Sequence, residues 1–166
     1  DFSSPLDAAL RYAAIGWPVF PCNPGKQPYN THGHNEATTD AEQIDRWWRR
    51  WPDAQVGIPA GEAGLCVIDL DVNGEKGKDG LSTFALVEDD NGPHWCGLIA
   101  SSPRGGRHLY YLMPDPPIQR SIDIDVGMLA AGTKKSGVDV CGFGGYVIAP
   151  SPASKREWVV GSPFDV

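Results

Sequence analysis

Two aspartates stand two positions apart in an otherwise apolar stretch, residues 65–71 with the sequence LCVIDLD. Side chains at positions i and i+2 of a strand point to the same face, which would place the Cα atoms of Asp69 and Asp71 roughly 6.5 Å apart. Two carboxylates held this close inside a folded core repel each other and lose hydration unless a cation compensates them. A hard divalent ion with oxygen ligands supplies that compensation. The pair therefore predicts a metal site.

The same Asp-x-Asp pattern recurs at Asp123 and Asp125 in a different setting. There the polar residues alternate strictly with β-branched apolar ones, which is typical of a half-exposed strand over 121–126. The first pair has apolar neighbours on both faces of the chain, which indicates a central, buried strand. We therefore assign metal binding to Asp69 and Asp71, and a solvated face to the second pair.

A third carboxylate, Asp139, lies in a short apolar run, residues 138–141, that precedes a glycine-rich turn. A single aspartate in a strand is usually structural. Together with Asp69 and Asp71, however, it can complete a cradle of three carboxylates for two ions about 3.5–4 Å apart. That arrangement serves in-line displacement at a phosphoryl group.

A basic, glycine-containing segment, residues 101–108, offers a site for anions. Its glycines can expose backbone N–H groups, and its arginine and histidine side chains add charge and donors. Beside a metal cradle the segment indicates a triphosphate clamp, whereas alone it would be an ordinary basic hairpin turn. The candidate nucleotide-binding residues are Arg104, Gly105, Gly106, Arg107 and His108, with Lys26, Lys134 and Lys135 as weaker candidates in loops.

Composition and charge narrow the classes of function. The chain has 166 residues, which suits one domain, and a net charge of −7. Proteins that grip duplex DNA without sequence preference usually carry the opposite balance, so any DNA footprint should be small and local. The four cysteines include no C-x-x-C pair, which disfavours a zinc site. With no signal peptide and no membrane-spanning run, a cytoplasmic protein is expected.

The elements that must position these residues are two helices, then strands with one further helix. Apolar periodicity predicts helices over 4–16 and 39–51, the second beginning in a capping box at Thr39, and a third near 79–88. The residues of the third helix expected to face inward are Leu81, Phe84 and Ala85. Strands are expected at 17–21, 55–59, 65–71, 96–101, 107–113, 121–126, 138–141, 145–149 and 157–160. This order predicts an α+β domain.

Taken in order, these segments resemble the N-terminal domain of bifunctional DNA primase-polymerases, within the archaeo-eukaryotic primase superfamily. The resemblance covers nearly the whole chain, and many motifs in one order are far more specific than any single one. The matching segments are GWPVFP at 16–21, GKQP at 25–28, HG at 32–33, ATTD at 37–40, WPDA at 51–54, IDLD at 68–71, RGGRH at 104–108, GVDV at 137–140 and GGYVIAP at 144–150.

The resemblance implies the primase fold: an RRM-like, mixed or antiparallel catalytic sheet with flanking helices and an N-terminal helix-strand unit. Residues 1–166 would form one catalytic domain, excised from a longer, phage-, plasmid- or bacterium-encoded replication protein that often also carries a helicase. The resemblance further implies that Asp69, Asp71 and Asp139 bind two Mg²⁺ or Mn²⁺ ions, and that His108 contacts nucleotide phosphates. The expected partners are a single-stranded DNA template, a primer and nucleoside triphosphates, with no membrane.

The third motif departs from the family pattern at two positions. The residue two beyond Asp139 is usually basic, whereas here it is Cys141. The position two further on is often polar or acidic, whereas here it is Phe143. The lost cation weakens any phosphate or template contact made from that strand, but neither change removes a proposed metal ligand.

The expected activity is DNA-templated synthesis or extension of primers, and two other classes stay open. A metal-dependent phosphohydrolase or nuclease would use the same three carboxylates to shorten DNA. A non-catalytic nucleotide- or RNA-binding module would bind its ligand without divalent metal. The preference for ribo- or deoxynucleotides is also open. An aromatic gate against the 2′-hydroxyl would come from among Tyr110, Tyr111, Phe143 and Tyr146.

Overall fold

The computed structural model describes residues 1–165. The elements, in chain order, are α1 (Pro5–Ala14), β1 (Phe20–Cys22), η1 (Gly33–Glu36), α2 (Ala41–Arg50), β2 (Gln55–Pro59), β3 (Leu65–Leu70), β4 (Val72–Asn73), η2 (Gly74–Lys76), β5 (Lys78–Asp79), α3 (Gly80–Asn91), β6 (Ile99–Ser101), β7 (Arg107–Leu112), β8 (Val138–Cys141), β9 (Tyr146–Ile148) and β10 (Trp158–Val160). The prediction of an α+β domain is confirmed.

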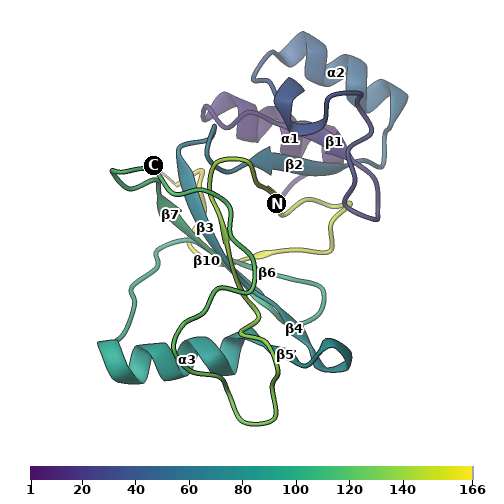
Figure 1. Cartoon of the computed structure of the whole chain (residues 1–166). Coiled ribbons are helices and arrows are strands. Elements are labelled where there is room, and N and C mark those ends of the chain that lie inside the picture. The colour runs from purple at the N-terminus through teal and green to yellow at the C-terminus, as the bar shows by residue number, and fades with distance from the viewer. Residues whose placement is uncertain (166) are drawn as a thin grey trace.

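Two sheets organise the chain (Figure 1). A five-stranded sheet has the order β10-β6-β7-β3-β8, and a three-stranded sheet has the order β1-β2-β9. Every strand pairing within them is antiparallel. The chain passes between the two sheets three times, from β2 to β3, from β8 to β9 and from β9 to β10. The strands that carry Asp69 and Asp139, β3 and β8, therefore lie where the chain crosses between the two sheets.

The N-terminal unit consists of α1, α2 and the three-stranded sheet. In α1 the Ser4 hydroxyl accepts the N–H of Asp7 at 3.1 Å, as expected for an N-cap. The cap of α2 is Asp40, whose carboxylate accepts the N–H of Glu42 at 3.0 Å, so the capping box predicted at Thr39 is wrong by one residue. Aspartate is the stronger N-cap of the two residue types, which explains the shift.

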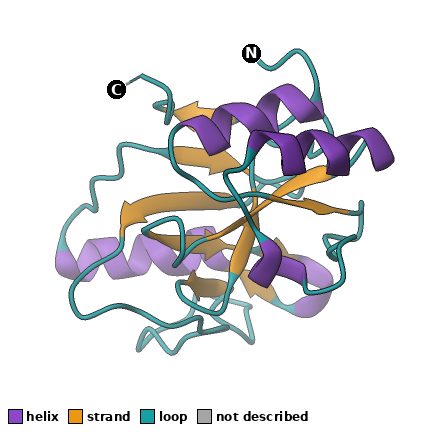
Figure 2. Ribbon diagram, turned by 90° about the horizontal axis from the view of Figure 1, so that it is seen from above, coloured by secondary structure: helices purple, strands orange, loops and turns teal. Residues whose placement is uncertain are grey.

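The two faces of the five-stranded sheet are covered by different elements. One face carries Val67 and Tyr110 and packs on α1, α2 and β2. The other carries Leu70 and Leu109 and packs on Phe84 of α3. Figure 2 shows α1 and α2 on one side of the strands and α3 on the other. This sandwiching makes β3 the buried central strand that its apolar sequence predicts.

Two local predictions are wrong. In α3 only Phe84 of the expected trio is buried, while Leu81 and Ala85 are exposed. Thr83 is buried instead because its hydroxyl accepts the N–H of Ala130, which brings a long loop over that face of the helix.

The second wrong prediction is the strand over 121–126. This segment hydrogen-bonds irregularly along the free edge of β8, with Ser121 and Val140 exchanging two bonds of 2.8 Å. The backbone of Asp123 has φ 45°, outside the range of a strand, and this interrupts the pairing. The other expected strands are found, with their ends shifted by three residues or fewer. No helix within residues 1–165 is long and apolar enough to cross a membrane.

The turn before β7 packs closely on the end of β3. A Cβ atom at Gly106 would collide with the carbonyl oxygen of Leu70. A glycine is therefore needed here, where the basic segment meets the strand that carries Asp69.

We expect Gly106→Ala to lower the free energy of unfolding by about 1–3 kcal/mol, the usual cost of overpacking. Gly97→Ala is the matched control, because a Cβ there meets nothing within 4 Å, and its effect should stay within about 0.5 kcal/mol. Urea unfolding of both variants measures the difference. Equal losses in the two variants would contradict the packing argument.

Candidate functional site

A row of polar side chains crosses three neighbouring strands. Asp69 of β3 is the direct register partner of His108 on β7 and of Asp139 on β8. Directly opposed residues share a face, with Cβ atoms roughly 4.5–5.5 Å apart. Asp71 follows Asp69 by two positions and continues on the same side. The structure thus brings together the three predicted aspartates and His108.

The site lies at the edge of the area of the five-stranded sheet that the N-terminal unit covers. Along β3, Val67 is fully buried beneath that unit, whereas the Asp69 and Asp71 side chains are 27% and 26% exposed. The strand therefore runs from a packed core into an accessible cleft. Asp69 lies on the strand itself, and Asp71 follows its end, held by backbone hydrogen bonds with Gly137 and Gly80. Both carboxylates are open to a ligand.

The pairing of Asp69 with His108 is the first electrostatic feature of the site. The His108 side chain is 3% exposed, and its Nε2 lies 3.4 Å from Oδ1 of Asp69. Burial alone would raise the pKa of Asp69. The hydrogen bond and charge of His108 outweigh burial, so the pKa of that carboxyl lies below its ordinary value.

A lysine ammonium lies among the other carboxylates. Nζ of Lys78 is 2.9 Å from Oδ1 of Asp123, 3.8 Å from Oδ2 of Asp71 and 4.0 Å from Oδ1 of Asp139. Asp123, which we expected on a solvated strand, also donates its backbone N–H to Oδ1 of Asp139 at 2.7 Å. Burial raises the pKa of Asp139, and the Asp123 N–H and Lys78 offset this only in part.

A pocket of about 220 Å³ opens beside these residues. Of the expected nucleotide-binding residues, Arg104, His108 and Lys26 line it, and Nη2 of Arg104 reaches Oδ1 of Asp71 at 3.3 Å. Gly105, Gly106 and Arg107 do not line it. Arg107 instead donates to the carbonyl oxygen of Gly106 at 3.0 Å, bracing its own turn. Lys134 also lies outside the pocket lining, while Nζ of Lys135 is 3.4 Å from Asp123.

Lys26 reaches the pocket because of a tight turn in the N-terminal loop. Lys26 has φ 66°, its N–H donates to the carbonyl oxygen of Asn23 at 2.9 Å, and its own carbonyl oxygen accepts the Tyr146 hydroxyl at 2.9 Å. Burial, followed by the nearby charge of Arg156, lowers the pKa of the Lys26 ammonium. The loop thus adds a cation to the pocket from the N-terminal unit.

Arg156 is a pocket residue that sequence reasoning missed. Its side chain is 5% exposed, and its Nε and Nη1 have no hydrogen-bond partner among residues 1–165. Burial lowers the pKa of its guanidinium, which still lies near Asp69 and Asp71. In the sequence the segment ASKREW resembles a solvated loop, so no local signal marks it. A buried cation without partners is costly, and a bound anion would relieve that cost.

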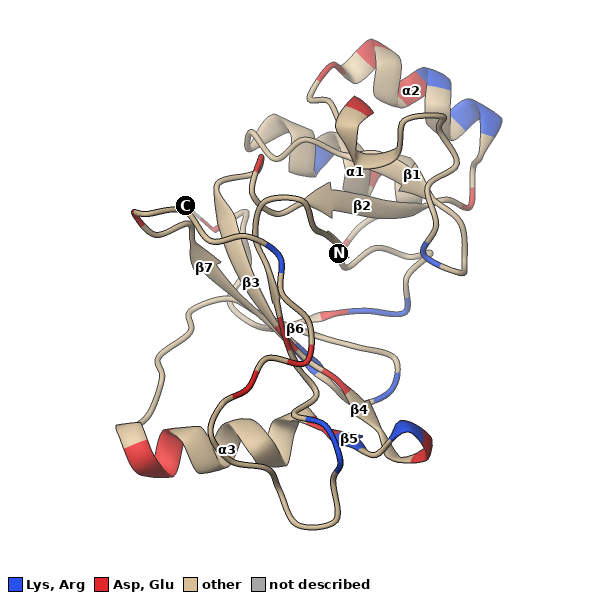
Figure 3. Ribbon diagram, viewed as in Figure 1, with Lys and Arg blue, Asp and Glu red and all other residues tan. Residues whose placement is uncertain are grey.

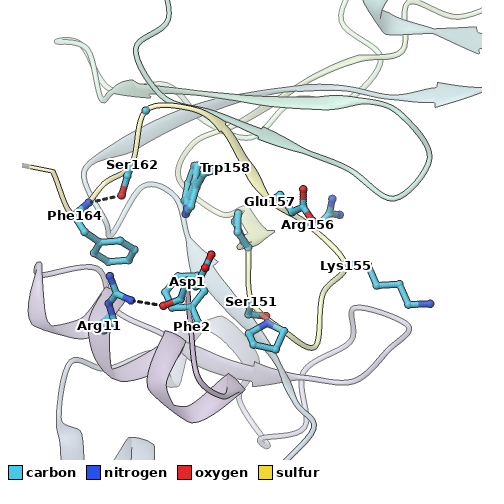
Figure 4. A pocket seen from close by; sticks show the side chains of 13 residues that line it. Asp1, Phe2, Arg11, Ser151, Lys155, Arg156, Glu157, Trp158, Ser162 and Phe164 are labelled. Carbon is cyan, nitrogen blue, oxygen red and sulfur yellow. Dashed lines mark hydrogen bonds between the residues drawn. The ribbon is translucent and has the colours of Figure 1, made fainter.

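A larger pocket, of about 960 Å³, lies on the other side of Arg156 (Figure 4). Figure 4 shows Arg11 beside Phe2 and Phe164 at one side of this pocket and Arg156 at the other. The Arg11 guanidinium is already engaged, 4.5 Å from the centre of the Phe164 ring. None of the three aspartates of the row lines this pocket. The smaller pocket, which Asp69 and Asp71 line and Asp139 does not, is therefore the candidate site.

None of the four aromatic gate candidates lines the 220 Å³ pocket. Tyr110 is buried behind His108 and stacks on Trp17, with ring centroids 6.2 Å apart. Phe143 packs so closely on Gly61 that a Cβ there would overlap its ring. Among residues 1–165, the lining of the smaller pocket therefore offers no aromatic sugar gate.

The carboxylate oxygens of Asp69, Asp71 and Asp139 are of the kind that a hard divalent cation prefers as ligands. Acidic and basic residues meet around the ends of β3, β4 and β5 (Figure 3). As they stand in residues 1–165, no three His, Cys, Asp or Glu side chains form a group that could hold an ion. The Lys78 ammonium, within 4.0 Å of three carboxylates, is a stand-in cation there. Carboxylate oxygens arranged around a positive charge suit Mg²⁺ or Mn²⁺.

We expect Asp139→Asn and Asp69→Asn to change the stability of the metal-free protein in opposite directions. The raised pKa of Asp139 means that its charge destabilises the fold near neutral pH, and a neutral asparagine removes that cost. The lowered pKa of Asp69 means that its charge stabilises the fold, and asparagine forfeits that gain. In EDTA, thermal melts should show a higher Tm for the first variant and a lower Tm for the second. Shifts of the same sign would refute this reading of the site.

Comparison with known proteins agrees with the geometry. No curated protein matches the chain. A family model described as bifunctional DNA primase/polymerase, N-terminal, matches residues 9–164. The matched range includes the polar row across the sheet, Lys26, Lys78 and Arg156. The match spans nearly the whole sequence. The chain therefore belongs to the bifunctional DNA primase/polymerase family.

Proposed function

We propose that this chain is a DNA-templated nucleotidyltransferase that synthesises or extends primers from nucleoside triphosphates by two-metal-ion catalysis. The observation that supports the proposal is one face of one sheet. Asp69 and Asp71 line a pocket into which Arg156 brings a charge without hydrogen-bond partners, and Asp139 is the register partner of Asp69 on the neighbouring strand. Family membership supports the primase/polymerase class. Residues 1–166 would act as one catalytic domain with the primase fold, and a helicase partner stays a prediction.

The three aspartates are the residues we propose to hold Mg²⁺ or Mn²⁺. When bound, the ions supply neutralisation of phosphoryl charge and acidification of the attacking 3′-hydroxyl. The chain contributes fixed oxygens, because Asp69 and Asp139 are register partners on adjacent strands. Their positions are set before any ligand arrives, so little reorganisation is needed during the reaction.

The basic side chains are assigned to the triphosphate. Lys26, Arg104 and Arg156 line the pocket together with His108. His108 is the strand partner of Asp69, so a phosphate that it contacts is held beside the carboxylates. The reaction forms a bond from the 3′-oxygen to the α-phosphorus and breaks the bond from that phosphorus to the bridging oxygen. The hydroxyl proton passes to solvent, and the charge of the leaving pyrophosphate is neutralised by the basic residues.

Replacing Asp69 and Asp71 together with alanine should abolish nucleotide incorporation, because two of the three proposed metal ligands are lost. The matched control is Asp89→Ala with Asp90→Ala, which removes two exposed acidic residues from α3. The assay is gel-resolved extension of a labelled primer on a DNA template, with dNTPs or NTPs and Mg²⁺ or Mn²⁺.

Incorporation by the folded Asp69/Asp71 variant would end the metal hypothesis. In the wild type, metal-dependent lengthening establishes the polymerase, and products without a primer establish the primase. Shortening of the primer would instead support the hydrolase. Nucleotide binding without metal, with the DNA unchanged, would support the binding module.

Arg156→Met should raise KM for the nucleotide by roughly 10- to 100-fold, the worth of a charged hydrogen bond. The same change should raise Tm without nucleotide, since it removes a buried, unpaired charge. Lys155→Met is the neighbouring control, because that side chain is exposed. Steady-state kinetics and thermal melts together check the assignment. An unchanged KM in Arg156→Met, or equal effects in both variants, would exclude a phosphate role for Arg156.

A further inference from the structure

Lys78 occupies the centre of the acidic cluster. It lies on β5, which pairs with β4 in a small hairpin, and its side chain is 12% exposed. Its ammonium is within 4.0 Å of carboxylate oxygens from Asp71, Asp123 and Asp139. Two of these are proposed metal ligands, and the third is not. The shortest of the three contacts, 2.9 Å, is to Asp123, the one outside the proposed metal set.

The hairpin places Lys78 by backbone contacts. The carbonyl oxygen of Gly77 accepts the N–H of Lys134 at 2.9 Å, and Lys78 forms a parallel bridge with Lys135. Gly77 has φ 66°, which favours glycine at this turn. The hairpin is therefore tied to the segment that leads into β8, which carries Asp139. The backbone of Lys78 is thus paired on two sides, with β4 and with the segment at Lys135, which distinguishes it from an ordinary surface lysine.

An ammonium and a divalent ion compete for the same oxygens. Without metal, the ammonium compensates Asp139 and shares the compensation of Asp71 with Arg104, whose Nη2 lies 3.3 Å from the other oxygen of Asp71. With metal on those oxygens, like charges would stand a few ångströms apart in a partly buried site, where screening is weak. Asp123 offers the ammonium an acceptor that metal binding leaves free.

We propose that Lys78 is a built-in counter-ion of the metal site. Its ammonium holds Asp71 and Asp139 in place before metal arrives, competes with the divalent ion, and is retained by Asp123 once the ion binds. Lys78 is thus a positioning residue that sets metal affinity. The inference rests on the proposed function, because it takes Asp71 and Asp139 as metal ligands.

The test measures the Kd for Mn²⁺ without nucleotide, by counting free Mn²⁺ with electron paramagnetic resonance. Lys78→Met should bind Mn²⁺ roughly tenfold more tightly than the wild type, because a like charge is removed from the site. Lys76→Met is the matched control: it removes the same charge from the adjoining, exposed turn and should leave Kd unchanged. Lys78→Gln repeats the test with a polar side chain should the methionine variant not fold.

A second variant tests the role of Asp123. Asp123→Asn should weaken Mn²⁺ binding, because Lys78 then stays on Asp71 and Asp139. In the Lys78→Met background the same change should have little effect, since Asp123 acts through Lys78. Equal weakening in both backgrounds would mean that Asp123 acts on the ion directly, and would overturn its role as acceptor.

Two failures are distinguishable. A wild type that binds Mn²⁺ and extends primers, with an unchanged or weaker Kd in Lys78→Met and Lys78→Gln, would overturn the role of Lys78 and leave the proposed function standing. A folded wild type that neither binds Mn²⁺ nor extends primers would overturn both.

Discussion

The repulsion among the carboxylates at one end of β3 is the constraint on which the neighbouring structure depends, because nearby cations must offset it. Asp69 and Asp139 face each other across two strands, and Asp71 and Asp123 lie close by. So much negative charge in a partly buried place destabilises a fold unless cations compensate it. The protein, acidic as a whole, concentrates cations here. The same charge that costs stability prepares the site for metal and phosphate.

The compensation comes from separate parts of the chain, which explains the arrangement of the two sheets. The N-terminal loop brings Lys26, the β4–β5 hairpin brings Lys78, and the segment before β10 brings Arg156. Lys26 precedes the crossing from β2 to β3, Lys78 lies in the hairpin that directly follows β3, and Arg156 lies in the crossing from β9 to β10. The close packing of Gly106 on Leu70 fixes the turn that adds Arg104. The candidate pocket is therefore built from several separate parts of the fold.

The placing of Asp69 and Asp71 on one side of the chain could be predicted from sequence because strand alternation is local. An apolar strand with carboxylates at positions 69 and 71 places both on one face, whatever the rest of the chain does. The register of Asp139 opposite Asp69 depends on the pairing of two distant strands. Lys78, Asp123 and Arg156 could not be predicted in this way. Their positions depend on a hairpin, on a residue with φ 45° and on a crossing between the sheets. The local sequence of Arg156 resembles a solvated loop, and that of Asp123 resembles a half-exposed strand. The strand predicted over 121–126 failed for the same reason, since alternation there did not reveal the turn at Asp123.

The most direct test of the account is a crystal structure with Mn²⁺ and a non-hydrolysable nucleoside triphosphate, with the metal located by anomalous scattering. The account predicts two peaks about 3.5–4 Å apart, bound by Asp69, Asp71 and Asp139, with the triphosphate on the basic residues of the smaller pocket. Lys78 should then contact Asp123 alone. Peaks at other residues, or none at this face of the sheet, would contradict the assignment of the catalytic site.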